Sequence, residues 1–139
     1  MANEIALTTA DRVEIVESIV QMTLPAVEAV TAGMGVRIDT TTGKWTKAKG
    51  TEAGEARIWG VATRTVAAGG ALTAIRKGVM DGWDLSAMAY DDPVYLSDTD
   101  GRLSTVAGTV STVVGRVIAG TSTTLGVAFD KILSVEVGG

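Results

Sequence analysis

The chain carries the same short pattern twice. It runs through residues 35–46 (Gly-Val-Arg-Ile-Asp-Thr-Thr-Thr-Gly-Lys-Trp-Thr) and again through residues 93–104 (Pro-Val-Tyr-Leu-Ser-Asp-Thr-Asp-Gly-Arg-Leu-Ser). Each copy is a short apolar run, a turn rich in Asp, Thr and Gly, and a second short run. This order predicts a β-hairpin, with Gly43 and Gly101 at the turn position where the backbone φ is positive.

The correspondence extends beyond the hairpins. Val36 aligns with Val94, and after a short shift Gly60 aligns with Gly115. Each half therefore reads as a strand, a turn, a return strand, a loop of small residues and a strand with a central glycine. One such unit cannot bury its apolar face alone, so the two are expected to form one β-barrel or sandwich. The pattern is compatible both with duplication and with convergence on the same strand chemistry.

The composition agrees with an all-β fold. The 139 residues are 46% hydrophobic and 20% charged, which is typical of one folded domain. Aromatic residues are only 4%, and there are 17 glycines, so small and β-branched side chains must fill the core. We expect a small β-barrel or sandwich at residues 25–139, with at most one short helical turn at residues 84–88, capped by Asp84. Further strands are expected at residues 57–65, 71–77, 125–129 and 132–137.

Residues 1–24 are predicted to form an N-terminal arm and a first strand. Residues 1–11 contain one small apolar patch, at Ile5 and Leu7, and are expected to be poorly ordered unless something binds them. Residues 12–24 fit a helical spacing of apolar residues as well as a strand. Their enrichment in valine and isoleucine favours the strand.

Charge and missing residue types restrict the function. The formal charge is −4, and no basic run occurs, which argues against nucleic acid as a partner. The chain has no cysteine and no histidine, so disulfides, thiolate metal sites and Ser–His catalysis are excluded. No apolar run has the length of a membrane span, and no secretion signal opens the sequence. These observations favour a soluble protein that is not an enzyme, requires no cofactor and stays where it is made, in the cytoplasm.

Acidic residues gather near the second hairpin. Asp98 and Asp100 beside Gly101 have the close spacing of a calcium loop, but the later glutamate of an EF-hand is missing. Aspartate is also common in turns, because its side chain bonds nearby backbone amides. We interpret these residues as turn chemistry and predict no metal site. Asp91 and Asp92 are neighbours on an extended segment, so their side chains are expected to point to opposite faces.

The large side chains have two interpretations. Trp45, Trp59 and Trp83 are either core residues or lie at a contact between subunits, where tryptophan is enriched. Ile5 and Leu7 of the arm and Tyr95 of the second hairpin join them as candidate contacts with another subunit or a larger assembly.

The second half carries a family resemblance. Its motifs are Asp-Pro-Val-Tyr-Leu-Ser at residues 92–97, Asp-Gly at residues 100–101 and Val-Gly-Arg-Val at residues 114–117. From about residue 24 onward, the chain resembles the small capsid decoration (cement or head-stabilising) proteins of tailed bacteriophages. The resemblance implies a β-rich virion protein on the exterior of an icosahedral head, bound to the major capsid protein as homotrimers at three-fold positions. It also implies that the protein stabilises the shell against the pressure of the packaged DNA, and that an N-terminal segment contacts the capsid.

A different class remains open beside this resemblance. The tryptophans and the Asp-rich turns are also typical of a small β-module that binds a carbohydrate or another ligand.

Overall fold

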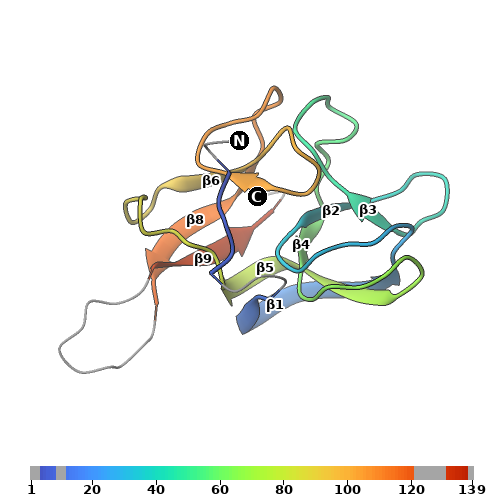
Figure 1. Cartoon of the computed structure of the whole chain (residues 1–139), viewed down its shortest axis with the longest axis horizontal. Helices are drawn as coiled ribbons and strands as arrows, with labels where there is room; N and C mark the ends of the chain where they lie inside the picture. Colours follow the sequence, from blue (N-terminus) through green and yellow to red (C-terminus); the bar gives the residue numbers. More distant parts are fainter. Residues whose placement is uncertain (1–3, 9–11, 121–130, 138–139) are drawn as a thin grey trace.

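The structure is a computed structural model, and it describes residues 4–8, 12–120 and 131–137. This part of the chain contains no helix, and its strands form one antiparallel sheet that curls into a half-barrel (Figure 1). The all-β prediction is confirmed. The strands are β1 (Glu14–Pro25), β2 (Gly35–Ile38), β3 (Trp45–Lys47), β4 (Gly60–Ala62), β5 (Ala71–Asp81), β6 (Pro93–Leu96), β7 (Leu103–Ser104), β8 (Val113–Ala119) and β9 (Lys131–Glu136).

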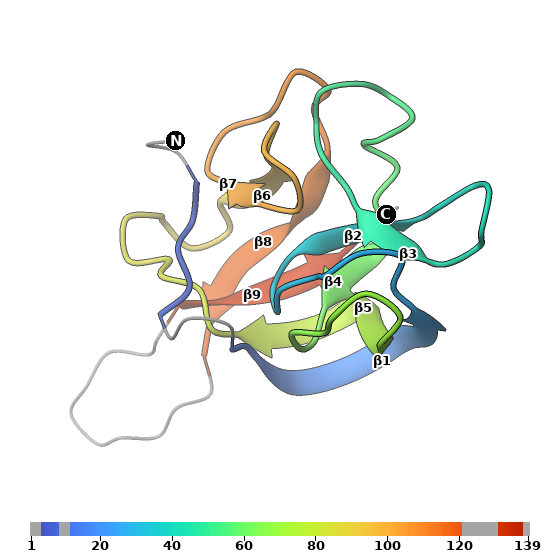
Figure 2. The same cartoon turned by 45° about the vertical axis from the view of Figure 1, so that its right-hand side comes forward.

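The strand order is symmetric. It reads β3-β2-β4-β5-β9-β8-β6-β7, so each half contributes a hairpin, a third strand and one strand of the central β5–β9 pair (Figure 2). β1 stands outside this order and pairs with β5. Because β4 and β9 together occupy one edge of β5, β1 covers the other edge.

The strand register confirms that the two aligned hairpins are equivalent in space. Val36 faces Gly60 across β2 and β4, and Val94 faces Gly115 across β6 and β8. The turn glycines of both hairpins have positive φ, 71° at residue 43 and 70° at residue 101.

The central glycines of the two halves have similar surroundings. Gly60 lies against Ile75 of β5, and Gly115 lies against Ser134 of β9. The equivalence ends at the central strands. β4 and β9 pair with the same edge of β5, whereas β8 and β5 pair with opposite edges of β9.

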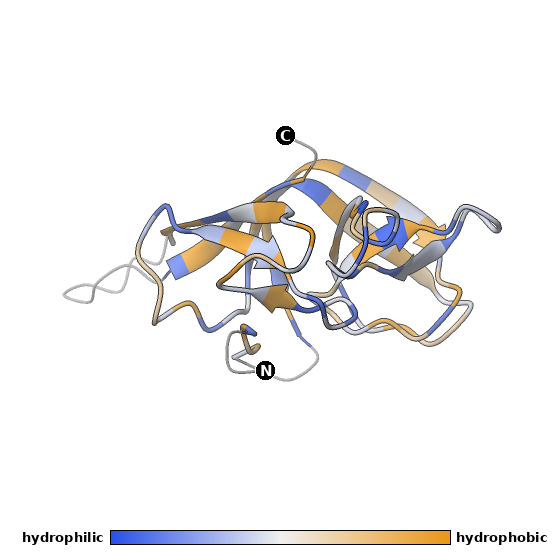
Figure 3. Ribbon diagram, turned by 90° about the horizontal axis from the view of Figure 1, so that it is seen from above, coloured by the Kyte–Doolittle hydropathy of each residue, from blue (hydrophilic) through white to orange (hydrophobic). Residues whose placement is uncertain are grey.

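The core has two parts. A smaller cluster around Trp45 lies under the first hairpin, and a larger one around Met80 and Leu133 joins both halves. Apolar and polar residues alternate along the strands, as expected for a sheet with one buried face (Figure 3).

No helical turn forms, and one strand is shorter than predicted. Residues 84–88 contain a turn and no helix, within the limit of at most one short helical turn. Asp84 Oδ1 accepts hydrogen bonds from both the amide and the hydroxyl of Ser86 at 3.2 and 2.6 Å, the kind of bond that a helix cap makes. The strand expected at residues 57–65 is limited to β4. Residues 12–24 do form a strand, as the β-branched enrichment predicted. The strand expected at residues 125–129 lies outside the described residues.

The N-terminal arm is paired where it is described. The Ile5 amide donates to the Leu103 carbonyl at 2.9 Å, and the Thr8 amide donates to the Gly82 carbonyl at 2.8 Å. The Ile5 side chain is buried and Leu7 packs on the core, so residues 4–8 cross from β7 to the end of β5 as part of the fold. The expectation of a poorly ordered arm does not hold for these residues, because the side chains of Ile5 and Leu7 both pack against the core.

Candidate functional site

The most exposed apolar surface lies on β1. Nine large apolar side chains of the described residues are exposed, and four of them lie within six positions of this strand. They are Ile15 (47% exposed), Val16 (47%), Ile19 (57%) and Val20 (41%), which together we name the β1 ridge. No described strand pairs with the outer edge of β1, so backbone donors and acceptors are also free there.

Bulges in β1 explain why the ridge is exposed. The register with β5 shifts between Ile15 and Glu17 and again between Ser18 and Val20, which leaves Val16 and Ile19 without partners in β5. Gly78 of β5 permits this, because a Cβ there would collide with the Glu17 carbonyl. The bulged half of β1 is exposed at every position, whereas Met22 and Leu24 further along pack on the core.

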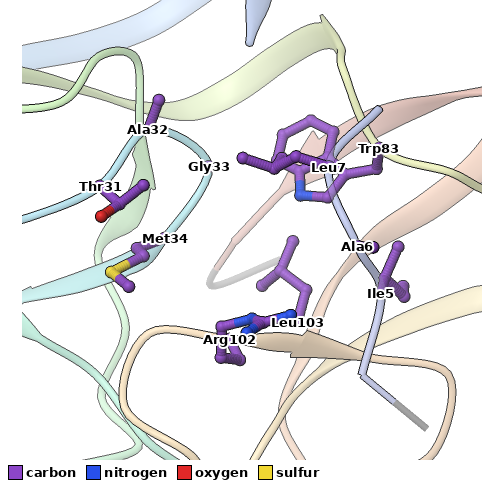
Figure 4. A pocket seen from close by; sticks show the side chains of 10 residues that line it. All are labelled: Ile5, Ala6, Leu7, Thr31, Ala32, Gly33, Met34, Trp83, Arg102 and Leu103. Atoms are coloured by element: carbon purple, nitrogen blue, oxygen red, sulfur yellow. The ribbon is translucent and has the colours of Figure 1, made fainter. Parts of the chain in front are cut away.

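A hollow of about 360 Å³ lies between the arm and the turn at residues 31–34. Figure 4 shows Leu7, Trp83 and Leu103 on one side of it and Met34 on the other. Arg102 is its only charged lining residue, and its Nη1 lies 3.9 Å from Glu4 Oε1. The lining therefore offers apolar contacts, one cation and the hydroxyl of Thr31.

A wider cleft of about 930 Å³ collects three arginines around Trp59. Arg76 donates to the Trp59 carbonyl at 3.1 Å and lies over the indole ring, 5.4 Å from its centroid. Arg37 and Arg57 line the same cleft, together with two carboxylates, Glu52 and Glu55. A planar or acidic group fits this chemistry.

Three aspartates near the second hairpin have bonding partners within the fold. Asp98 accepts hydrogen bonds from the amide and the hydroxyl of Thr109, each at 2.8 Å, and these hold the pKa of its carboxyl below the ordinary value. The Ser86 hydroxyl and amide likewise lower the pKa of Asp84. Asp100 lies 3.7 Å from Lys49. Asp84 thus bonds within its own turn, as interpreted from the sequence, whereas Asp98 and Asp100 hold other loops. Within residues 4–8, 12–120 and 131–137, no three acidic side chains gather as metal ligands do.

The neighbouring pair Asp91 and Asp92 is also engaged. Asp91 Oδ1 accepts a hydrogen bond from Arg116 at 3.1 Å, and Asp92 Oδ2 accepts one from the Ala89 amide at 2.9 Å. Both carboxylates thus have structural partners, and neither faces a cleft described above.

The six candidate contact residues separate into two groups. Trp45, Trp83 and Ile5 are buried within the chain, and Trp45 Nε1 donates to the Leu72 carbonyl at 2.8 Å. For these residues the core interpretation fits the structure. The other three keep part of their surface accessible: they are Leu7, Trp59 and Tyr95.

Sequence reasoning did not select the β1 ridge as a contact surface. The available signal was the density of β-branched residues between Ile15 and Val20. This density distinguishes a strand from a helix but does not show which side chains are exposed. The bulges that turn Val16 and Ile19 outward depend on β5 and leave no mark in β1 itself.

Comparison with known proteins adds no relationship. No protein-family model matches the chain, and no curated protein matches it. A search of the described residues for a helix long and apolar enough to cross a membrane finds none.

Proposed function

We propose that this protein is a structural virion protein that binds the exterior of an icosahedral bacteriophage head and stabilises the shell against internal DNA pressure. Its partners are the major capsid protein and further copies of itself, arranged as trimers at three-fold positions. The protein acts by binding and performs no catalysis.

The observation that carries this proposal is the β1 ridge. An apolar patch on an unpaired strand edge is a protein-binding surface, because such an edge pairs readily with another chain. The turn aspartates, by contrast, are bound within the fold, as Asp84 and Asp98 show. The molecule thus offers a surface suited to assembly.

The choice of a phage shell as partner rests on the resemblance of residues 92–117. Repeated binding over a shell suits a small subunit, since many modest contacts add up through multivalency.

Co-sedimentation with expanded shells of the phage that encodes the chain tests the proposal. We expect the purified protein to sediment with the shells and to raise their disruption temperature. Unexpanded shells, to which the protein is expected not to bind, are the control. A protein that leaves expanded shells bare and their thermal stability unchanged overturns the proposal.

The Trp59 cleft favours a second candidate, a module that binds an acidic ligand or a carbohydrate. Its three arginines and its partly accessible indole suit a planar or anionic group. Calorimetric titration with neutral and acidic glycans tests this, with Trp59→Ala as the matched variant. Heat that is lost in Trp59→Ala supports the ligand module, and silence across the glycans removes it.

A further inference from the structure

We propose that the β1 ridge binds the β1 ridge of a second copy of this chain, by antiparallel pairing of the two outer edges of β1. The inference rests on the proposed role as an assembly subunit and names the surface through which copies meet.

The β1 ridge is exposed on both faces of the strand and along its outer edge. Residues 14–21 are exposed at every position, so both faces of this part of the strand meet solvent as well as its outer edge. An added strand bonds the free backbone groups and brings its own side chains to both faces. A partner that only lay on one face would leave the edge unpaired.

The sequence of β1 is self-complementary in the antiparallel direction. Setting Val16 of one copy opposite Ile19 of the other places Ile15 opposite Val20. Glu14 and Glu17 then face Gln21 and Ser18 of the other copy. A parallel pairing in register would place each glutamate beside its own equivalent, which is destabilising.

A nearby cation adds charge complementarity. Lys77 of β5 is exposed and is the register partner of Val20 on one side and of Glu136 on the other. Glu14 lies at the opposite end of the ridge from Val20, and Glu17 lies at its middle. Antiparallel pairing reverses one copy, so Lys77 of each copy approaches the glutamates of the other. The contact occurs twice because the pairing is two-fold symmetric.

A two-fold contact is compatible with trimers on a shell. Pairing through β1 joins two neighbouring trimers and needs no residue of the three-fold contact. In solution a monomer that pairs gives a dimer. A trimer carries three ridges, and two trimers that pair through all three give a closed hexamer.

Light scattering of the purified full chain, without shells, tests the inference. We expect an even number of copies for the unaltered protein and half that number for Ile19→Lys, because an ammonium group is placed in the apolar contact. Val106→Lys is the matched control, since Val106 is 48% exposed and lies outside β1; we expect its mass to be unchanged.

Charge reversal supplies a second test that leaves the apolar residues intact. We expect Glu17→Lys and Lys77→Glu each to weaken the pairing measured by dilution, and the double variant to restore it. A failure of the double variant to associate more tightly than both single variants overturns the charge contact and with it the antiparallel direction.

The remaining outcomes are decisive. A protein that is monomeric or an odd-numbered oligomer, or an Ile19→Lys variant of unchanged mass, overturns the inference. Shell binding is measured separately: a monomer that still sediments with shells leaves the proposed function standing and removes only this inference. Pairing of copies without shell binding leaves this inference standing and removes the proposed function.

Discussion

Gly60 and Gly115 hold the same position in the two halves of the sheet. A Cβ atom at residue 60 would lie 2.6 Å from the Ile75 carbonyl oxygen, and one at residue 115 would lie even closer to the Ser134 carbonyl oxygen. Both glycines are therefore required by the close approach of a neighbouring strand, β5 in one half and β9 in the other.

Replacing either glycine by alanine should destabilise the protein. The added methyl group has to push a backbone carbonyl away within the sheet, which we expect to cost about 1–3 kcal/mol of unfolding free energy. Urea denaturation of Gly60→Ala and Gly115→Ala measures this. Gly54→Ala is the control, because its Cβ would meet nothing within 4 Å and its φ is not positive; we expect no loss of stability. Alanine variants at residues 60 and 115 as stable as the control would contradict the equivalence.

Trp45 should contribute to stability through its hydrogen bond as well as its volume. Trp45→Phe keeps an aromatic ring but leaves the buried Leu72 carbonyl without its donor, and we expect a loss of about 1–3 kcal/mol. Trp45→Ala should cost more, about 3–5 kcal/mol, because a cavity is left in the core. Denaturant unfolding measures both variants. Trp59→Phe, at a partly accessible site, should cost less than Trp45→Phe, and the reverse order would contradict the burial assigned to these two residues.

The arm should be part of the cooperative fold. Ile5→Ala removes a buried side chain next to Leu103 and is expected to lower the unfolding free energy by about 2–4 kcal/mol. Ala6→Ser changes the exposed neighbour and should have little effect. Thermal unfolding compares the two. Equal midpoints for Ile5→Ala and the unaltered protein would mean that the arm is not docked.

Asp98 should make stability depend on pH in acid. The Thr109 amide, followed by the Thr109 hydroxyl, holds the pKa of Asp98 below its ordinary value of 3.8 in the folded state. The contribution is therefore fully present above the unfolded value and is lost as the pH falls through the lowered folded value. We expect the unfolding free energy to fall less on acidification in Asp98→Asn than in the unaltered protein.

The titration of the Asp98 carboxyl, followed by NMR, checks the cause. Thr109→Val removes the hydroxyl donor and keeps the amide, so the pKa of Asp98 should rise part of the way toward its ordinary value. A carboxyl that titrates at or above 3.8 in the unaltered protein would contradict the assignment.

The hairpins and their equivalence were predictable because turn glycines and alternating apolar residues are local signals, as Gly43 and Gly101 show. The partner of Asp98 was not predictable from local turn chemistry, because Thr109 lies in a different loop. The position of the arm was not predictable, because Ile5 finds its cover on Leu103, which is remote in sequence. The ridge was missed for a similar reason, since the exposure of Ile19 is set by the bulged pairing with β5.

The central β5–β9 pair has a consequence for synthesis. β5 is translated well before β9. The edge of β5 that pairs with β9, at Lys77–Met80, therefore leaves the ribosome without a partner. The first half of the chain can form its hairpin and pair β1 with β5, but β5 gains its pairing with β9 only when the second half has been made. Contacts this distant along the sequence slow folding, and during that interval the nascent chain displays an unpaired strand that a chaperone or a neighbouring nascent copy can reach.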